Sequence, residues 1–217
     1  EFVTCQPEIE IKGVFSHLAA SDTHEGEKLT KQQINNFNRV TKKIEKKLNM
    51  PVVKHILNTS GIENYTANCF DMVRLGIGIY GISKNLKLNN VATLKTKISK
   101  IRTVSPNKQI GYGTKSTVKQ KIKIGIIPIG YADGFSRALG NGKATVFING
   151  NYAPTFGNIC MDMSFINLTS IDAKIGDTVE IFGENNSIEK LANSINTIPY
   201  EILSSISNRV VRVYNKD

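Results

Sequence analysis

The sequence predicts a chain in two parts, with parallel β/α architecture first and a mainly β domain after it. Two observations lead to this division. Over roughly the first 90 of the 217 residues, short apolar segments alternate with helical segments and polar loops. After about residue 93, strand-like segments follow one another closely, with turn residues between them. We place the boundary at residues 86–95 and assign 1–90 to the β/α part and 91–217 to the β domain.

The β/α part is predicted to begin with a strand, a helix and a second strand. Residues 10–20 are strand-like, and at residues 29–48 apolar positions recur at helical spacing with lysines largely on the opposite face. Pro51 ends this amphipathic helix. Buried strands are predicted at 52–57 and 72–79. Because a complete β/α barrel has eight strands, the three or four strand–helix units counted here make only part of one.

The second part is predicted to be built mainly from strands. Residues 144–154 form a predicted hairpin around Asn149-Gly150-Asn151, because Asn-Gly favours a two-residue turn. The other predicted elements are strands at 121–129, 178–182 and 209–214 and a short helix at 187–196.

Composition excludes several classes of protein. Hydrophobic residues make up 40% and charged residues 21%, which is ordinary for a globular chain. No run of about 18 apolar residues suggests a membrane span, and the N-terminal residues lack a signal-peptide pattern. The chain also has no initiator Met, so we expect it to be cut from a longer protein. Its scattered cysteines, Cys5, Cys69 and Cys160, favour a reducing compartment and argue against structural zinc.

The net charge of +10 raises the possibility of a nucleic-acid-binding protein. The densest lysines lie at 41–54 and 95–123, without interleaved aromatic residues that could stack on bases. A solvated face explains them better, and an anionic small ligand would also suit the charge. Nucleic-acid binding is therefore the least favoured alternative, and we expect no nucleic-acid partner and no membrane.

Residues 76–81 match the pattern GxGxxG. A dinucleotide site also needs an acidic residue about 20 positions further on, but no acid stands between Asp71 and Asp133. A simpler interpretation is an anion site, with Arg74 on a strand and glycines that let backbone N–H groups approach the anion.

Histidines and tyrosines supply the candidates for proton transfer. His17 lies near the end of a predicted strand, and the three histidines are not spaced as metal ligands, so no metal is expected. Tyr112 stands between glycines, and Tyr131 follows one. A phenol acts as an acid or base only when nearby cations stabilise its phenolate.

Six motifs, in order, resemble the alanine racemase family over roughly residues 10–214. They are FSHLAASD (15–22), HILNTSG (55–61), VRLGIGIYG (73–81), GYG (111–113), IPIGYADGFSR (127–137) and GNICMD (157–162). The resemblance implies an eight-stranded TIM-type barrel, of which this chain would hold the last three or four units, followed by the β domain. It also implies a cytoplasmic enzyme that interconverts L- and D-alanine for peptidoglycan, working as a head-to-tail homodimer.

The resemblance further implies the cofactor pyridoxal 5'-phosphate (PLP), with its Schiff-base lysine outside this chain. Arg74 would face the pyridine nitrogen, and because a guanidinium keeps its protons, that nitrogen would stay unprotonated. Thr59, with the backbone of Gly76 and Ile77, would hold the phosphate. The fragment by itself is expected to be inactive.

Catalytic and substrate roles follow from the same resemblance. Tyr112 would be the second catalytic base, opposite the lysine, in the site of the partner subunit. His17 would hydrogen-bond toward Tyr112 and Arg74, and the Met161 N–H would receive the substrate carboxylate. The access channel would be lined by Tyr131 and Arg137, with Asp162 near it.

Two positions depart from the family pattern. Asn208, in the cofactor and substrate pocket, stands where many members of the family have a tyrosine, and from this we expect serine to be accepted as well as alanine. Asn158 replaces an arginine of the form GRxCMD. Two alternatives therefore stay open: a racemase of broader or serine specificity, and a non-catalytic interaction module that retains the fold. The full protein is expected to be either a stand-alone racemase or one fused to a cell-wall ligase.

Overall fold

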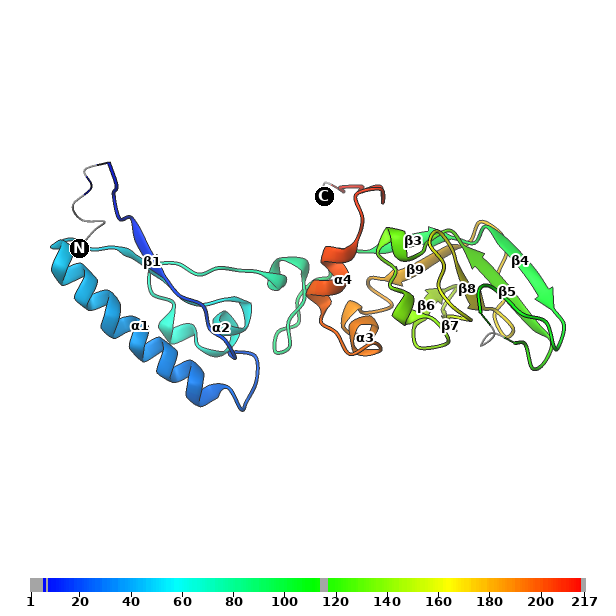
Figure 1. Ribbon diagram of the computed structural model, residues 1–217, viewed down its shortest axis with the longest axis horizontal. Coiled ribbons are helices and arrows are strands. Elements are labelled where there is room, and N and C mark those ends of the chain that lie inside the picture. Colours follow the sequence, from blue (N-terminus) through cyan, green and yellow to red (C-terminus); the bar gives the residue numbers. More distant parts are fainter. Residues whose placement is uncertain (1–5, 7, 114–116, 216–217) are drawn as a thin grey trace. The chain divides into compact units, whose positions relative to one another are not determined.

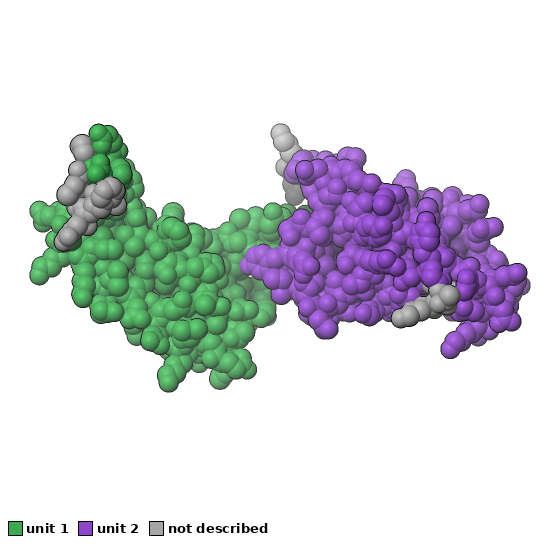
Figure 2. Space-filling model, viewed as in Figure 1, with its two compact units in different colours: residues 1–91 green, residues 92–217 purple. Residues whose placement is uncertain are grey.

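The computed structural model describes residues 6, 8–113 and 117–215, which form two compact units within 1–91 and 92–217 (Figure 2). Each unit buries an apolar cluster of its own. Of the three cysteines, Cys5 lies outside the described residues. No helix among the described residues is long and apolar enough to cross a membrane.

The first unit begins with a β/α/β arrangement (Figure 1). Strand β1 (Gly13–Phe15) pairs in parallel with β2 (Val53–His55), and helix α1 (Glu27–Leu48) connects them. The helix buries Ile34 and Phe37 in a cluster that also contains Leu18, Ile56 and Leu57. Its backbone turns left-handed at Asn49 (φ 54°), just before Pro51. The predicted amphipathic helix is therefore confirmed.

The strand predicted at 72–79 is wrong. The Arg74 N–H donates to the Leu57 carbonyl (2.9 Å), but residues 72–76 form no ladder, and Ile77–Tyr80 form a 3₁₀ helix, η3. The glycines of this segment explain why no strand forms. Glycine weakens a strand and permits backbone conformations that do not occur in strands. Gly81, for example, ends η3 with φ 78°. The described part of this unit thus holds two strands, with α2 (Thr59–Asn64) and the 3₁₀ helix η2 (Thr66–Asn68) after β2.

The second unit contains two antiparallel sheets. One has the strand order β3-β9-β6-β7 and the other β4-β5-β8. Their bounds are β3 Leu94–Lys97, β4 Lys100–Val104, β5 Ile122–Ile127, β6 Thr145–Ile148, β7 Asn151–Pro154, β8 Ser164–Asn167 and β9 Thr178–Phe182. Asn149 (φ 46°) and Gly150 (φ 79°) form the β6–β7 turn, which confirms the predicted hairpin.

Helices and short 3₁₀ segments complete the second unit. Helix α3 (Ile188–Asn193) lies within the predicted helical segment and begins after the N-cap Ser187, whereas α4 (Pro199–Ser205) was not predicted. The 3₁₀ helices η5 (Tyr131–Asp133) and η6 (Arg137–Leu139) follow β5. The strand predicted at 209–214 is wrong, because this segment pairs with no described strand and its apolar residues, such as Val211, are exposed.

Candidate functional site

In the first unit, the Arg74 guanidinium lies in a dense group of acceptors. Its Nη2 is 2.6 Å from the Ser16 carbonyl oxygen and 3.4 Å from His17 Nδ1. Its Nη1 is 2.6 Å from His55 Nδ1 and 3.2 Å from the His55 carbonyl oxygen. The guanidinium carbon also lies 5.4 Å from the centre of the Phe15 ring. These contacts hold a permanent cation on the segment that follows the parallel strands.

His55 contacts Arg74 closely, although its place in an apolar segment of the sequence indicates no such role. A guanidinium can only donate, so His55 Nδ1 must accept, and a neutral ring then carries its proton on Nε2. The half-buried ring stacks on Phe15, its partner in the β1–β2 register (5.5 Å between centroids). His55 therefore orients Arg74. Strand register is what places it there, and no local sequence pattern reports it.

Thr59 and the glycine-rich segment form what we term the Thr59 cradle: the Thr59 hydroxyl and the N–H groups of Gly76, Ile77 and Gly78. Thr59 Oγ1 accepts from Gly76 N (3.0 Å) and Gly78 N (3.3 Å). A hydroxyl has two acceptor positions and one donor, so the Thr59 O–H is left to donate. Among the described residues, the Ile77 N–H also has no acceptor. The cradle thus presents two free donors, which suits an anion.

Gly78 allows the cradle to close. A Cβ at Gly78 would lie 3.0 Å from Thr59 Cγ2 and 2.9 Å from Leu75 Cδ1, so a larger residue would require these side chains to shift. Thr59 itself is only 4% exposed, although it begins helix α2. Its burial fixes the hydroxyl in place.

In the second unit, Tyr112 lies at the tip of what we term the Tyr112 turn, residues 111–113. The glycines on either side have positive φ values, 71° at Gly111 and 83° at Gly113. The tyrosine side chain is 73% exposed, and its phenol makes no hydrogen bond to another described residue. The turn therefore leaves the tyrosine exposed to solvent. The Asn158 side chain donates to the Tyr112 carbonyl (2.7 Å).

Met161 and Tyr131 lie together on two loops that hydrogen-bond to each other. Tyr131 N donates to the Cys160 carbonyl and Ala132 N to the Met161 carbonyl, both at 3.0 Å. A Cβ at Gly130 would lie 2.3 Å from both of those carbonyl oxygens, so only glycine permits this approach. The Met161 N–H has no acceptor among the described residues, which leaves it available for a ligand.

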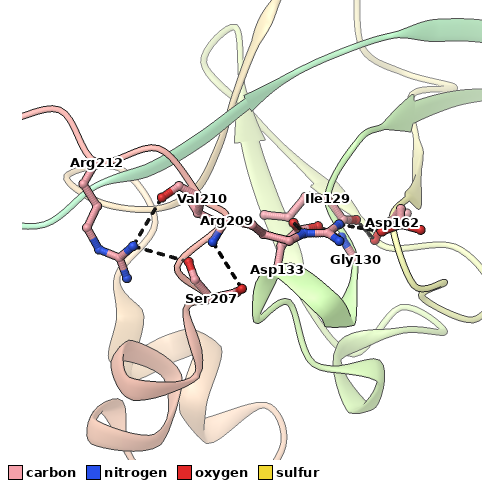
Figure 3. A network of polar contacts seen from close by, with 9 residues as sticks. Ile129, Gly130, Asp133, Asp162, Ser207, Arg209, Val210 and Arg212 are labelled. Atoms are coloured by element: carbon pink, nitrogen blue, oxygen red, sulfur yellow. Dashed lines mark hydrogen bonds and ion pairs between the residues drawn. The ribbon is translucent and has the colours of Figure 1, made fainter.

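Arg209 joins these two loops to the C-terminal segment (Figure 3). Its Nε donates to Asp133 Oδ1 (2.6 Å) and its Nη2 to Asp162 Oδ1 (2.5 Å), while the other oxygen of Asp133 accepts from Gly130 N (2.8 Å). Hydrogen bonds to Asp133 and then Asp162 raise the pKa of Arg209 above its usual value. The network fixes the backbone beside Asn208, and no local sequence pattern indicates this role for Arg209.

The candidate residues thus fall into two groups, one in each unit. The first brings together His17, Arg74, Thr59, Gly76 and Ile77, and the second holds Tyr112, Tyr131, Met161, Asp162 and Asn208. Asn208 and Arg137 have exposed side chains.

The structure describes no group of three or more His, Cys, Asp or Glu residues that could hold a metal ion. Burial raises the pKa of the Cys160 thiol, which makes it a poor nucleophile.

A β/α part that carries an anion cradle, in one chain with an antiparallel β domain, defines a class of protein. This combination belongs to the barrel-plus-β-domain proteins of fold type III. Sequence families agree with this class. The model of the alanine racemase N-terminal domain matches residues 1–84, and that of the alanine racemase C-terminal domain matches 91–214. The chain belongs to the alanine racemase family.

Individual relatives support the same assignment. Alanine racemase 2 of Caldanaerobacter subterraneus subsp. tengcongensis is 37% identical over 95% of this chain and 55% of the relative. The solved alanine racemase of Clostridium difficile 630 has a TM-score of 0.86 at 37% identity, covering 95% of this chain and 56% of that one. The alanine racemase of Bartonella henselae, solved with covalently bound pyridoxal phosphate, has a TM-score of 0.84 at 32% identity, with coverages of 95% and 57%. The chain therefore spans about half the length of the relatives that it matches.

Proposed function

We propose that this chain is the C-terminal portion of a PLP-dependent alanine racemase that interconverts L- and D-alanine. The observation that carries the proposal is that the family motifs form two groups of hydrogen-bond donors. One group is the Arg74 guanidinium with the Thr59 cradle, and the other is the Tyr112 phenol on its exposed turn. Residues 1–90 would belong to the PLP-binding barrel and 91–217 to the β domain. The names of relatives at 35–38% identity support the substrate.

The residues present fit PLP. The Thr59 O–H and the Ile77 N–H, both without acceptors among the described residues, match the need of a phosphate for donors. Arg74 would face the pyridine nitrogen as a cation that cannot give up a proton. When bound, PLP draws electrons from the α-carbon of an attached amino acid and makes its α-hydrogen acidic. Its Schiff-base lysine would come from a part of the protein outside this chain.

The chain's own residues would then handle the substrate and one of two protons. Racemisation needs an acid or base on each face of the α-carbon. Tyr112 would serve one face in the partner's site of a head-to-tail homodimer, and the lysine would serve the other. His17, in contact with Arg74 (3.4 Å), would extend a cationic network toward the phenol. The Met161 N–H would receive the substrate carboxylate, and Tyr131 and Arg137 would line the access channel, with Asp162 near it.

The biological setting follows from the same proposal. A racemase of this kind would supply D-alanine for peptidoglycan in the cytoplasm, which agrees with the lack of any paired cysteines among the described residues. The presence of His17, Arg74 and Tyr112 together favours an enzyme over a non-catalytic interaction module.

The direct test is the full-length protein that contains this chain. We expect it to show a PLP absorbance band and to interconvert L- and D-alanine, measured by chiral chromatography. The isolated chain of 217 residues should show no turnover, since it would lack the lysine. A full-length protein that binds PLP but leaves both enantiomers of alanine unchanged would refute the proposed activity.

A racemase that also accepts serine is the second candidate, and Asn208 is the residue that favours it. Its exposed amide adds hydrogen-bonding capacity, and it is smaller than the tyrosine of the family pattern that the resemblance implies. We expect the full-length protein to turn over serine, and we expect Asn208→Tyr to lower the serine-to-alanine ratio of kcat/KM by about tenfold, as loss of one hydrogen bond and some space would predict. An unchanged ratio would exclude a role for Asn208 in specificity.

A further inference from the structure

Asn158 and Asn141 form a chain of side-chain amides that ends on the Tyr112 turn. Asn158 Nδ2 donates to the Tyr112 carbonyl oxygen (2.7 Å), and Asn141 Nδ2 donates to Asn158 Oδ1 (3.0 Å). A backbone carbonyl can only accept, so Asn158 must turn its NH₂ group toward Tyr112 and its oxygen toward Asn141. Asn141 must then present its own NH₂ group. The carbonyl of the turn thus sets the orientation of both amides.

The turn is shaped to receive this contact. A Cβ at Gly113 would lie 3.3 Å from Asn158 Nδ2, and a Cβ at Gly111 would lie 2.9 Å from the Phe165 ring. The turn therefore lies against Asn158 at one glycine and against a buried aromatic residue of β8 at the other. Asn141 is also anchored through its backbone, because its N–H donates to the Gly157 carbonyl (2.8 Å). Asn158, which contacts the turn, lies in the same loop as Cys160 and Met161.

The tyrosine ring has no anchor of its own. Its side chain is largely exposed, and neither a hydrogen bond nor a ring contact joins it to another described residue. The direction of the phenol therefore depends on the backbone at Tyr112. Two glycines of positive φ give that backbone little intrinsic stiffness, since glycine is the least restricted residue. The Asn158 amide holds the Tyr112 carbonyl, and the Tyr112 backbone N–H also lies near the Cys160 thiol.

We propose that Asn158, oriented by Asn141, is a positioning residue that sets where the Tyr112 phenol can reach. The inference rests on the proposed function, in which Tyr112 transfers the proton on one face of the substrate. Asn158 itself touches neither substrate nor cofactor in this scheme. A misplacement of about 1 Å can cost a factor of roughly a hundred in rate, so a hydrogen bond that fixes a catalytic turn affects turnover more than stability.

The test uses the full-length PLP-bound enzyme with Asn158→Asp. The carboxylate keeps the shape of the amide but cannot donate, so it opposes the Tyr112 carbonyl. We expect kcat to fall by about ten- to a hundredfold, while KM and PLP affinity stay unchanged. Exchange of the α-hydrogen with deuterated solvent should slow for one enantiomer of alanine only, the one served by Tyr112. Backbone hydrogen exchange of residues 111–113 should become faster.

Two further variants make the test specific. Asn141→Gly removes only the second amide, because glycine tolerates the positive φ of 59° at that position. It should lower kcat by about two- to tenfold, the equivalent of one neutral hydrogen bond. Asn151→Asp is the matched control: its amide donates to the Asn149 carbonyl (2.8 Å) in the β6–β7 turn, so the same kind of bond is lost elsewhere. That variant should behave as wild type.

Several outcomes would overturn the inference. If Asn158→Asp matches Asn151→Asp in both kcat and backbone exchange, Asn158 does not position the turn. If α-hydrogen exchange slows equally for both enantiomers, its effect is a general structural one. Should Asn158→Asp fail to fold, Asn158→Gln and Asn141→Gly carry the same readouts. If Tyr112→Phe leaves turnover normal, the catalytic role proposed for Tyr112 fails instead, and backbone exchange still shows whether Asn158 holds the turn.

Discussion

Replacing Tyr112 with phenylalanine should lower kcat of the full-length enzyme by about a hundred- to ten-thousandfold, the usual contribution of a positioned acid or base. The ring keeps its size and loses only the hydroxyl. Because the side chain is exposed and its phenol has no hydrogen-bond partner in the described structure, folding and PLP binding should not change. Since the equilibrium constant between enantiomers is one, kcat/KM must fall equally in both directions.

Isotope exchange separates this role from a general loss of activity. In deuterated solvent, Tyr112→Phe should still exchange the α-hydrogen of the enantiomer that the lysine serves, and it should fail to exchange that of the other. Tyr152→Phe is a suitable control, because that tyrosine lies in β7 and donates to the Asn185 carbonyl (2.5 Å), in a bond unrelated to the Tyr112 turn. Normal racemisation by Tyr112→Phe would show that another group moves the proton.

Arg74→Lys should weaken both the first unit and its affinity for PLP, although the charge is retained. The planar guanidinium of Arg74 contacts three backbone carbonyls and two imidazole nitrogens. An ammonium group is compact and cannot reach them all. We expect the free energy of unfolding without PLP to fall by about 1.5–3 kcal/mol, the value of one hydrogen bond to a charged group. The Kd for PLP should rise by about tenfold or more.

Denaturant unfolding and a PLP absorbance titration measure these two effects. The matched control is Arg39→Lys, the same substitution on the exposed face of α1, where Asn36 (3.4 Å) is the guanidinium's one hydrogen-bond partner among the described residues. That variant should keep wild-type stability and affinity. If Arg74→Lys is as stable as Arg39→Lys, the acceptors around Arg74 contribute nothing to the fold.

Local pattern was sufficient for several regular elements of this chain, although not for α4. The amphipathic helix at Glu27–Leu48, the hairpin at Asn149-Gly150 and the strand at Thr178–Phe182 each follow from neighbouring residues, through apolar period, positive φ or alternation. Two strand predictions failed for a shared reason. Residues 72–79 and 209–214 have apolar residues suited to a strand, but a strand also needs a partner, and no described strand pairs with either.

The candidate site divides in the same way. Arg74, Thr59, Gly76 and Tyr112 were found from motifs, because glycines and a neighbouring charged or hydroxyl group are visible along the chain. His55, Asn158 and Arg209 were not given roles in positioning other residues. Each acts on a residue at least 19 positions away in the sequence, through His55–Arg74, Asn158–Tyr112 and Arg209–Asp133 contacts.

The sequence by itself determined the family of this protein, the types of chemical group that it carries and the elements that depend on neighbouring residues. Only the tertiary structure decided which residues hold those groups in place: an imidazole against Arg74, an amide beneath Tyr112 and a guanidinium between Asp133 and Asp162. The physical reason is that hydrogen bonds form according to distance and direction in space. Folding sets both quantities through strand register and loop packing, which a short stretch of sequence does not contain.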